Sequence, residues 1–96
     1  AETAIDVVAG MPDDKRPKTA GFDISPKVLA AIADGRMLWT IDAQPYLMGY
    51  VPVVMFDLLK RYKLQPVVSE GLYATGPSFV EKADAIALQS LAPGVR

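Results

Sequence analysis

The chain has 96 residues, of which 51% are hydrophobic, and its formal net charge at pH 7 is −1. This length suits one small domain and is too short for two, and the near-neutral charge offers no basic surface for nucleic acid. Because the sequence contains neither Cys nor His, disulfide bonds, thiolate nucleophiles, zinc sites and Ser-His triads are excluded.

The amino-terminal part of the chain predicts a helix, a loop and a strand. Residues 1–8 combine alanine with β-branched residues as a helix end does, and Gly10 closes the segment before a loop over 11–17. Residues 19–22 are small and apolar, which favours a short central strand that is buried on both faces. Because Ala1 is not an initiator methionine and the helix begins abruptly, we expect the chain to be processed or to be a piece of a longer protein.

Ser25-Pro26 marks the start of the next helix. Serine is a favoured N-cap, and proline at the first helical position has no amide hydrogen to leave unpaired. Val28, Leu29 and Ile32 follow at helical spacing and predict the face that packs on the core. Gly35 is expected to end this helix in the left-handed conformation, which glycine adopts without strain.

A second strand is expected over 37–41, because its Trp, Thr and Ile residues favour pleated and buried surroundings. Residues 42–44 then form the exit loop of this strand. With Phe22 of the first strand, Trp39 is expected in the core, where strand aromatics are most often found.

The longest helical pattern begins at Pro45 and continues to Tyr62. Its apolar residues recur every three to four positions, and one face, expected to pack against the sheet, is formed by Val51, Met55, Leu58 and Leu59. Pro52 lies inside this pattern, where proline removes one backbone hydrogen bond and clashes with the preceding turn. We therefore expect a kink at Pro52, or a true helix start near Gly49.

The carboxyl-terminal third predicts a strand over 72–74, a turn over 75–77 and a final helix over 83–91. The complete order alternates helices with strands. Such alternation is typical of an α/β fold with a parallel sheet flanked by helices.

Polar side chains follow the first two strands at the point where each strand ends. In a parallel sheet all strands point the same way, so Asp23, Asp42 and Gln44 are expected to meet at one edge. A carboxylate accepts hydrogen bonds from hydroxyl groups, and an amide both accepts and donates them. This edge is therefore suited to a neutral polyol.

Each of these residues also has an ordinary structural interpretation. Asp23 would bond backbone N–H groups at the start of the Ser25-Pro26 helix, Gln44 would cap the helix begun by Pro45, and Asp42 would serve as a cap or turn residue. Tyr46 and Phe79, near expected loop starts, are secondary candidates for an aromatic face against the C–H surface of a sugar. Asp42 is a secondary candidate too, and it rests on geometry alone.

Several sequence strings, in this order and spacing, resemble the ligand-binding lobe of periplasmic sugar-binding proteins of the ribose-binding type. They are Gly21-Phe22-Asp23, the run over 40–50 that contains Gln44-Pro45-Tyr46, and the segment Thr75-Gly76-Pro77-Ser78-Phe79-Val80. The resemblance extends from about Lys18 to Lys82. It implies that all 96 residues form part of the second, carboxyl-terminal lobe of a type-1 periplasmic-binding-protein fold.

The resemblance also implies a function. It assigns Asp23 and Gln44 to sugar contact, with no metal and no cofactor, and it places the protein in the periplasm or another extracytoplasmic compartment. The partners would be a sugar or polyol, the remaining lobe of the parent protein, and the membrane permease of an ATP-dependent (ABC) importer. Two lobes would close on the ligand and the transporter would detect closure.

The sequence leaves two alternatives to this interpretation. An effector-binding domain similar to that of the lactose repressor has the same fold, and its output would be release of DNA. Catalysis by Asp23 and Asp42 as an acid and base has little support, since no nucleophile, metal set or phosphate-binding loop accompanies them, so the protein is not expected to be an enzyme. With one lobe missing, the isolated chain is expected to self-associate or to be marginally stable, and to bind sugar weakly.

Overall fold

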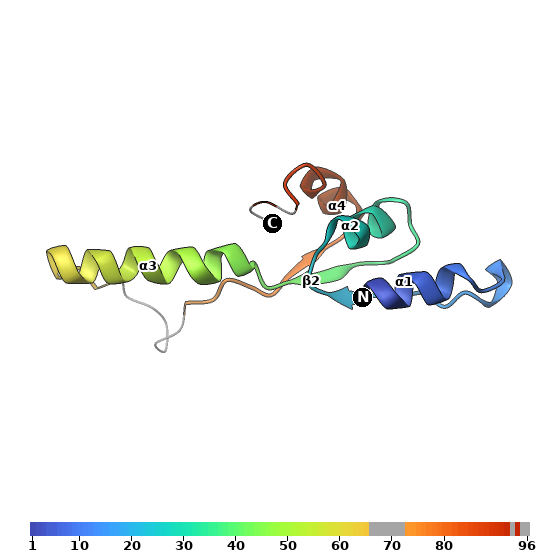
Figure 1. Cartoon of the computed structure of the whole chain (residues 1–96), viewed down its shortest axis with the longest axis horizontal. Coiled ribbons are helices and arrows are strands. Elements are labelled where there is room, and N and C mark those ends of the chain that lie inside the picture. The colour runs from blue at the N-terminus through green and yellow to red at the C-terminus, as the bar shows by residue number, and fades with distance from the viewer. Residues whose placement is uncertain (66–72, 93, 95–96) are drawn as a thin grey trace. The chain divides into compact units, whose positions relative to one another are not determined.

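The structure is a computed structural model of the chain, and it describes residues 1–65, 73–92 and 94 (Figure 1). Among these residues the elements in chain order are α1 (Glu2–Ala9), a 3-10 turn η1 (Asp13–Lys15), β1 (Gly21–Phe22), α2 (Pro26–Ala33), β2 (Thr40–Asp42), α3 (Pro45–Tyr62), β3 (Ser78–Val80) and α4 (Lys82–Leu88). None of the helices in the described part of the chain is long and apolar enough to cross a membrane.

The chain divides into two compact units, although its length predicts one domain. The first, which we call the sheet unit, comprises Ala1–Asp42 and Ser78–Arg96. The second, the helix unit, is the continuous segment Ala43–Pro77. The chain therefore leaves the sheet unit at the end of β2 and returns to it at the start of β3.

The sheet has three strands in the order β1-β2-β3. β1 and β2 are parallel, with Phe22 opposite Ile41, whereas β2 and β3 are antiparallel, with Ile41 opposite Phe79. The α/β class and the flanking helices are confirmed, and the parallel pairing is confirmed for β1 and β2. The sheet as a whole is mixed, because β3 runs in the opposite direction.

The third strand also lies at a different place in the sequence from the one expected. Of the predicted strand over 72–74, residue 72 lies outside the described residues, and Tyr73 and Ala74 are not in a strand. The Thr75 hydroxyl donates a hydrogen bond to the Ala43 carbonyl at 2.9 Å, so the returning chain lies beside the residue that follows β2. The next strand therefore enters from the carboxyl end of β2, which makes the pairing antiparallel.

One face of the sheet carries the core of the sheet unit. Along β2 the side chains of Thr40 and Asp42 are buried and that of Ile41 is only partly buried, as the period of two in a strand requires. Helices α1 and α4 both contact α2, and α4 also contacts β3 (Figure 1). The buried apolar residues are Ile5, Val28, Leu29, Ala31, Ile32, Met37, Val80 and Ala85.

The opposite face of the sheet is more open than the sequence suggests. Residues that pair across strands share a face, so Phe22, Ile41 and Phe79 form one row on the side away from Thr40 and Val80. Phe22 is 59% exposed and Trp39 is half-buried. The expectation of a core residue is therefore wrong for Phe22 within the sheet unit, because register places it on the face opposite Thr40 and Val80, and Trp39 is only partly buried.

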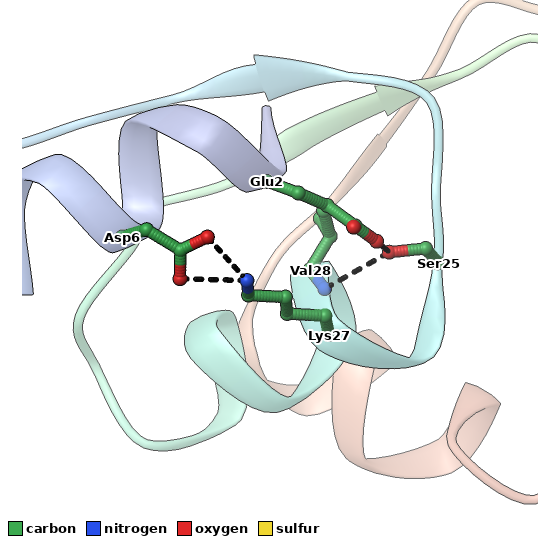
Figure 2. A network of polar contacts seen from close by, with 5 residues as sticks. All are labelled: Glu2, Asp6, Ser25, Lys27 and Val28. Carbon is green, nitrogen blue, oxygen red and sulfur yellow. Dashed lines mark hydrogen bonds and ion pairs between the residues drawn. The ribbon is translucent and has the colours of Figure 1, made fainter.

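The start of α2 is held by the contacts in Figure 2. The Ser25 hydroxyl accepts a hydrogen bond from the Val28 backbone N–H at 3.2 Å and donates one to the Glu2 carboxylate at 2.5 Å. Lys27 contacts both carboxylate oxygens of Asp6 at 2.6 Å, although both side chains are exposed and such pairs add little stability. The predicted Ser25 cap and Pro26 start of α2 are confirmed. The predicted left-handed conformation of Gly35 after this helix is confirmed too, because its φ is +85°.

Helix α3 begins at Pro45 and continues through Pro52, so the alternative start near Gly49 is wrong. None of its residues is buried. On the face expected to pack against the sheet, Val51, Met55 and Leu58 are half-buried and Leu59 is 41% exposed. Within the helix unit this face is therefore not buried, and its packing against the sheet, which belongs to the other unit, stays a prediction.

The core of the sheet unit gives a direct test of this arrangement. Leu29 is completely buried, so Leu29→Ala is expected to reduce the free energy of unfolding by about 2 to 5 kcal/mol. Ile86→Ala on α4 is the matched control, because Ile86 is 56% exposed and its loss should cost well under half as much. Urea denaturation measures both values, and equal losses for the two variants would contradict the assigned core.

Candidate functional site

Asp23 follows β1 directly and extends its pairing with β2 by one residue. Its backbone N–H donates to the Ile41 carbonyl at 2.8 Å, and its own carbonyl accepts from the Thr40 hydroxyl at 2.7 Å. Thr40 is completely buried. The backbone of Asp23 is thus fixed from both sides by β2. Sequence reasoning missed Thr40 as a positioning residue, because a strand threonine gives no signal of the bond its hydroxyl makes.

The carboxylate of Asp23 is exposed and does not cap α2. The Ser25 hydroxyl performs that role, and among the described residues the Asp23 carboxylate makes neither a hydrogen bond nor an ion pair. A shallow depression of about 230 Å³ lies beside it and is also lined by Phe22 and Ser25. The capping interpretation of Asp23 is therefore wrong, and its carboxylate is accessible to a ligand.

Gln44 is the N-cap residue of α3 and belongs to the helix unit. Its carbonyl accepts the first helical bond, from the Met48 N–H at 3.2 Å, but its side chain makes no capping hydrogen bond. The interpretation of the Gln44 side chain as a helix cap is therefore wrong. Gln44 is half-buried and follows the end of β2 by two residues along the chain.

Asp23 and Gln44 share an unusual backbone conformation. Their φ angles are +67° and +54°, in the left-handed region that costs a side-chain-bearing residue about 1 to 2 kcal/mol. The other described non-glycine residue with positive φ is Lys63, which ends α3, where this conformation is common. Strained backbone gathers at binding and catalytic sites, so its presence immediately after both strands supports their candidacy.

Asp42 occupies a different environment from the one expected. It is the last residue of β2, it lies opposite Ser78 of β3, and it is only 1% exposed. The expectation that Asp42 lies in an exit loop as a turn or cap residue is therefore wrong. Asp23 and Asp42 do lie at the carboxyl ends of neighbouring parallel strands, as predicted, but only Asp23 is open to solvent.

The two aromatic candidates are exposed and each contacts another aromatic ring. Tyr46 is 51% exposed and stacks on Tyr50 within α3, with ring centroids 5.9 Å apart. Phe79 is 59% exposed and meets Trp39 edge to face at 5.1 Å. Phe79 lies within β3, not at a loop start as expected. The described residues contain no cluster of three or more acidic side chains suited to a metal ion.

The strained conformation at Asp23 can be tested apart from any ligand. Asp23→Gly should leave the free energy of unfolding within about 0.5 kcal/mol of the parent, because glycine accepts φ of +67° without strain. Asp23→Ala should lose about 1 kcal/mol, because aspartate tolerates the left-handed region better than alanine does. Chemical denaturation gives both values, and a glycine variant less stable than the alanine variant would disprove the assigned backbone.

Comparisons with known proteins add one finding. No protein-family model matches the chain, and no curated protein matches it significantly. Among solved structures, the chain is similar to a carbohydrate transporter from Acidothermus cellulolyticus 11B, whose crystal structure holds myo-inositol. The match has a TM-score of 0.79 and 32% sequence identity, and it covers the whole of this chain but 34% of the other. The α/β fold of the chain thus matches part of that protein's fold.

Proposed function

We propose that the chain is part of a solute-binding protein that binds a sugar or a related polyol for import by an ABC-type transporter. The observation that carries this proposal is the match over the full chain to a carbohydrate transporter solved with myo-inositol. That likeness favours import over the alternative of a repressor's effector-binding domain. The chain spans about a third of that protein's length. The partners under this proposal are the remaining lobe of the parent protein and the membrane permease.

The chemistry of Asp23 and Gln44 fits a ligand rich in hydroxyl groups. The Asp23 carboxylate is exposed, so it is available to accept hydrogen bonds from two neighbouring hydroxyls of a sugar or inositol ring. The Gln44 amide offers one acceptor and two donors, so it suits a hydroxyl in either role. Neither group needs a metal or a cofactor for this task. Binding, with no chemical step, is the proposed activity.

A fixed backbone at Asp23 and Gln44 favours high affinity for a ligand. A ligand that meets side chains on a mobile loop must order that loop, and the ordering cost is subtracted from the binding free energy. Asp23 is held through its N–H and its carbonyl, and Gln44 lies at the first turn of an 18-residue helix. We propose an extracytoplasmic location, where importer subunits meet their solutes, and assign the chain to the second lobe.

The binding proposal is tested on the complete protein with myo-inositol. Asp23→Asn and Gln44→Ala should each weaken binding by about one to two decades, because each loses a hydrogen bond worth roughly 1 to 3 kcal/mol. Asp14→Asn is the matched control, since Asp14 is an exposed carboxylate in the η1 turn. Isothermal titration calorimetry measures the affinities. Unchanged affinity in both site variants would contradict the assigned site. If the parent protein binds neither inositol nor common monosaccharides, the proposed function is wrong.

The isolated 96 residues provide a separate test of completeness. Within its own unit, each of α3 and the sheet face that carries Phe22 and Phe79 presents exposed apolar side chains, so the isolated chain is expected to self-associate or to be marginally stable. Without a second lobe it should bind myo-inositol in the millimolar range at best. Sedimentation velocity and NMR titration measure both properties. A stable monomer with micromolar affinity would show that the chain is self-sufficient.

A further inference from the structure

A larger cavity lies at the other end of the strands from Asp23. Its walls come from α1 and from the segments that precede β1 and β2, and its volume is about 430 Å³. All of these segments belong to the sheet unit. The amino ends of the two parallel strands therefore border this cavity, while Asp23 lies at their carboxyl ends. The proposed sugar contact plays no part in forming it.

The cavity is built largely from apolar side chains. Ile5 and Val8 of α1 form one wall, and Pro17 and Leu38 come from the two loops. Ile5 is buried in the core, whereas Leu38 is 49% exposed, so the wall runs from the core to the surface. A volume of this size lies within the range of small-molecule sites, about 300 to 1,000 Å³. The apolar lining suits a ligand with a hydrocarbon body.

Among the described residues that line the cavity, the charged ones are all basic: they are Arg16, Lys18 and Arg36, and none of the described lining residues is a carboxylate. Arg16 is engaged elsewhere, because its guanidinium donates to the Ala9 and Met11 carbonyls at 3.0 and 2.9 Å and pairs with Asp13. These bonds satisfy the carboxyl end of α1 and tie the following loop to it. Arg16 therefore forms part of the cavity wall, and its charge is already paired with that of Asp13.

Arg36 is also compensated locally, by Asp34. The two side chains are 2.7 Å apart, and the Arg36 backbone N–H donates to the same carboxylate at 3.1 Å. Desolvation acts to raise the pKa of Asp34, but hydrogen bonds from Arg36 and the charges of Arg36 and Lys82 outweigh it and hold the pKa below its usual range. Asp34 is thus ionised at neutral pH and balances the charge of Arg36.

Lys18 is the third basic residue that lines the cavity. Within the described residues its ammonium group has no carboxylate partner, and its side chain is exposed at the cavity. An ammonium beside an apolar wall attracts a negatively charged group more strongly than it would in open water, because the wall lowers the local dielectric constant. The charge at this cavity that a ligand can neutralise is therefore that of Lys18.

We propose that this cavity is a second binding site, which takes a small organic carboxylate with its hydrocarbon body against Ile5, Val8 and Leu38 and its carboxylate on the ammonium of Lys18. A polyol suits this site less well, because its hydroxyl groups seek hydrogen-bond acceptors and none of the described lining residues is a carboxylate. The Thr19 carbonyl already accepts one hydrogen bond, from the Leu38 N–H at 2.9 Å. The two sites of the protein thus differ in the chemistry they select.

Octanoate and its neutral analogue octanamide are the probes, and the complete protein is the sample. Calorimetric titration should show saturable octanoate binding with one site per protein, and octanamide should bind at least about tenfold more weakly. Lys18→Met keeps the aliphatic stem and removes the charge, so it should weaken octanoate binding by about tenfold and leave octanamide binding unchanged. These results are expected whether or not the protein binds inositol.

The matched control is Lys60→Met, which removes a lysine charge from the exposed last turn of α3; Lys60 belongs to the helix unit and is not among the residues that line the cavity. It should leave octanoate affinity unchanged. Equal binding of octanoate and octanamide would overturn the assigned anion, and equal losses in the two lysine variants would show general charge attraction in place of a site. Absence of saturable octanoate binding would overturn the proposal as a whole.

Discussion

Strand β2 is the element on which the remainder of the sheet unit depends. It pairs with β1 on one side and with β3 on the other, and its register decides which side chains are buried. With Thr40 opposite Gly21 and Val80, one face of the sheet meets the helices and the row of Phe22, Ile41 and Phe79 is left on the other. A shift of one residue would exchange the two faces, so burial of the core specifies the register.

The same register fixes the candidate site. Parallel pairing places Asp23 one residue beyond β1, and the Thr40 hydroxyl then bonds its carbonyl while Ile41 accepts its N–H. The strained φ of Asp23 persists because these two bonds hold the backbone on both sides. The strained conformation of Asp23 costs stability, and the fixed backbone holds its carboxylate exposed to solvent. Such an arrangement suits binding without chemistry.

The two ends of the strands offer different chemistry. At the carboxyl ends, an exposed carboxylate that makes no bond among the described residues presents acceptors to hydroxyl groups. At the amino ends, a largely apolar cavity presents the ammonium of Lys18, which makes no ion pair with the residues that the structure describes. The difference arises because Asp13 and Asp34 neutralise Arg16 and Arg36 locally and leave Lys18 without a partner in the described structure. Selectivity at each end therefore follows from which charges are already paired.

Local features of the fold were readable in the sequence alone. The Ser25 cap, the Pro26 start, the Gly35 end of α2 and the span of α3 depend on contacts within a few residues, and local residue preferences predicted them. The α/β class and the placement of Asp23 at a strand end followed from the alternation of elements. The third strand, the exposure of Phe22 and the burial of Asp42 did not, because they depend on pairing between residues far apart in the chain. The tertiary structure decided these, along with the Thr40 bond and the Lys18 cavity, since only folding brings their parts together.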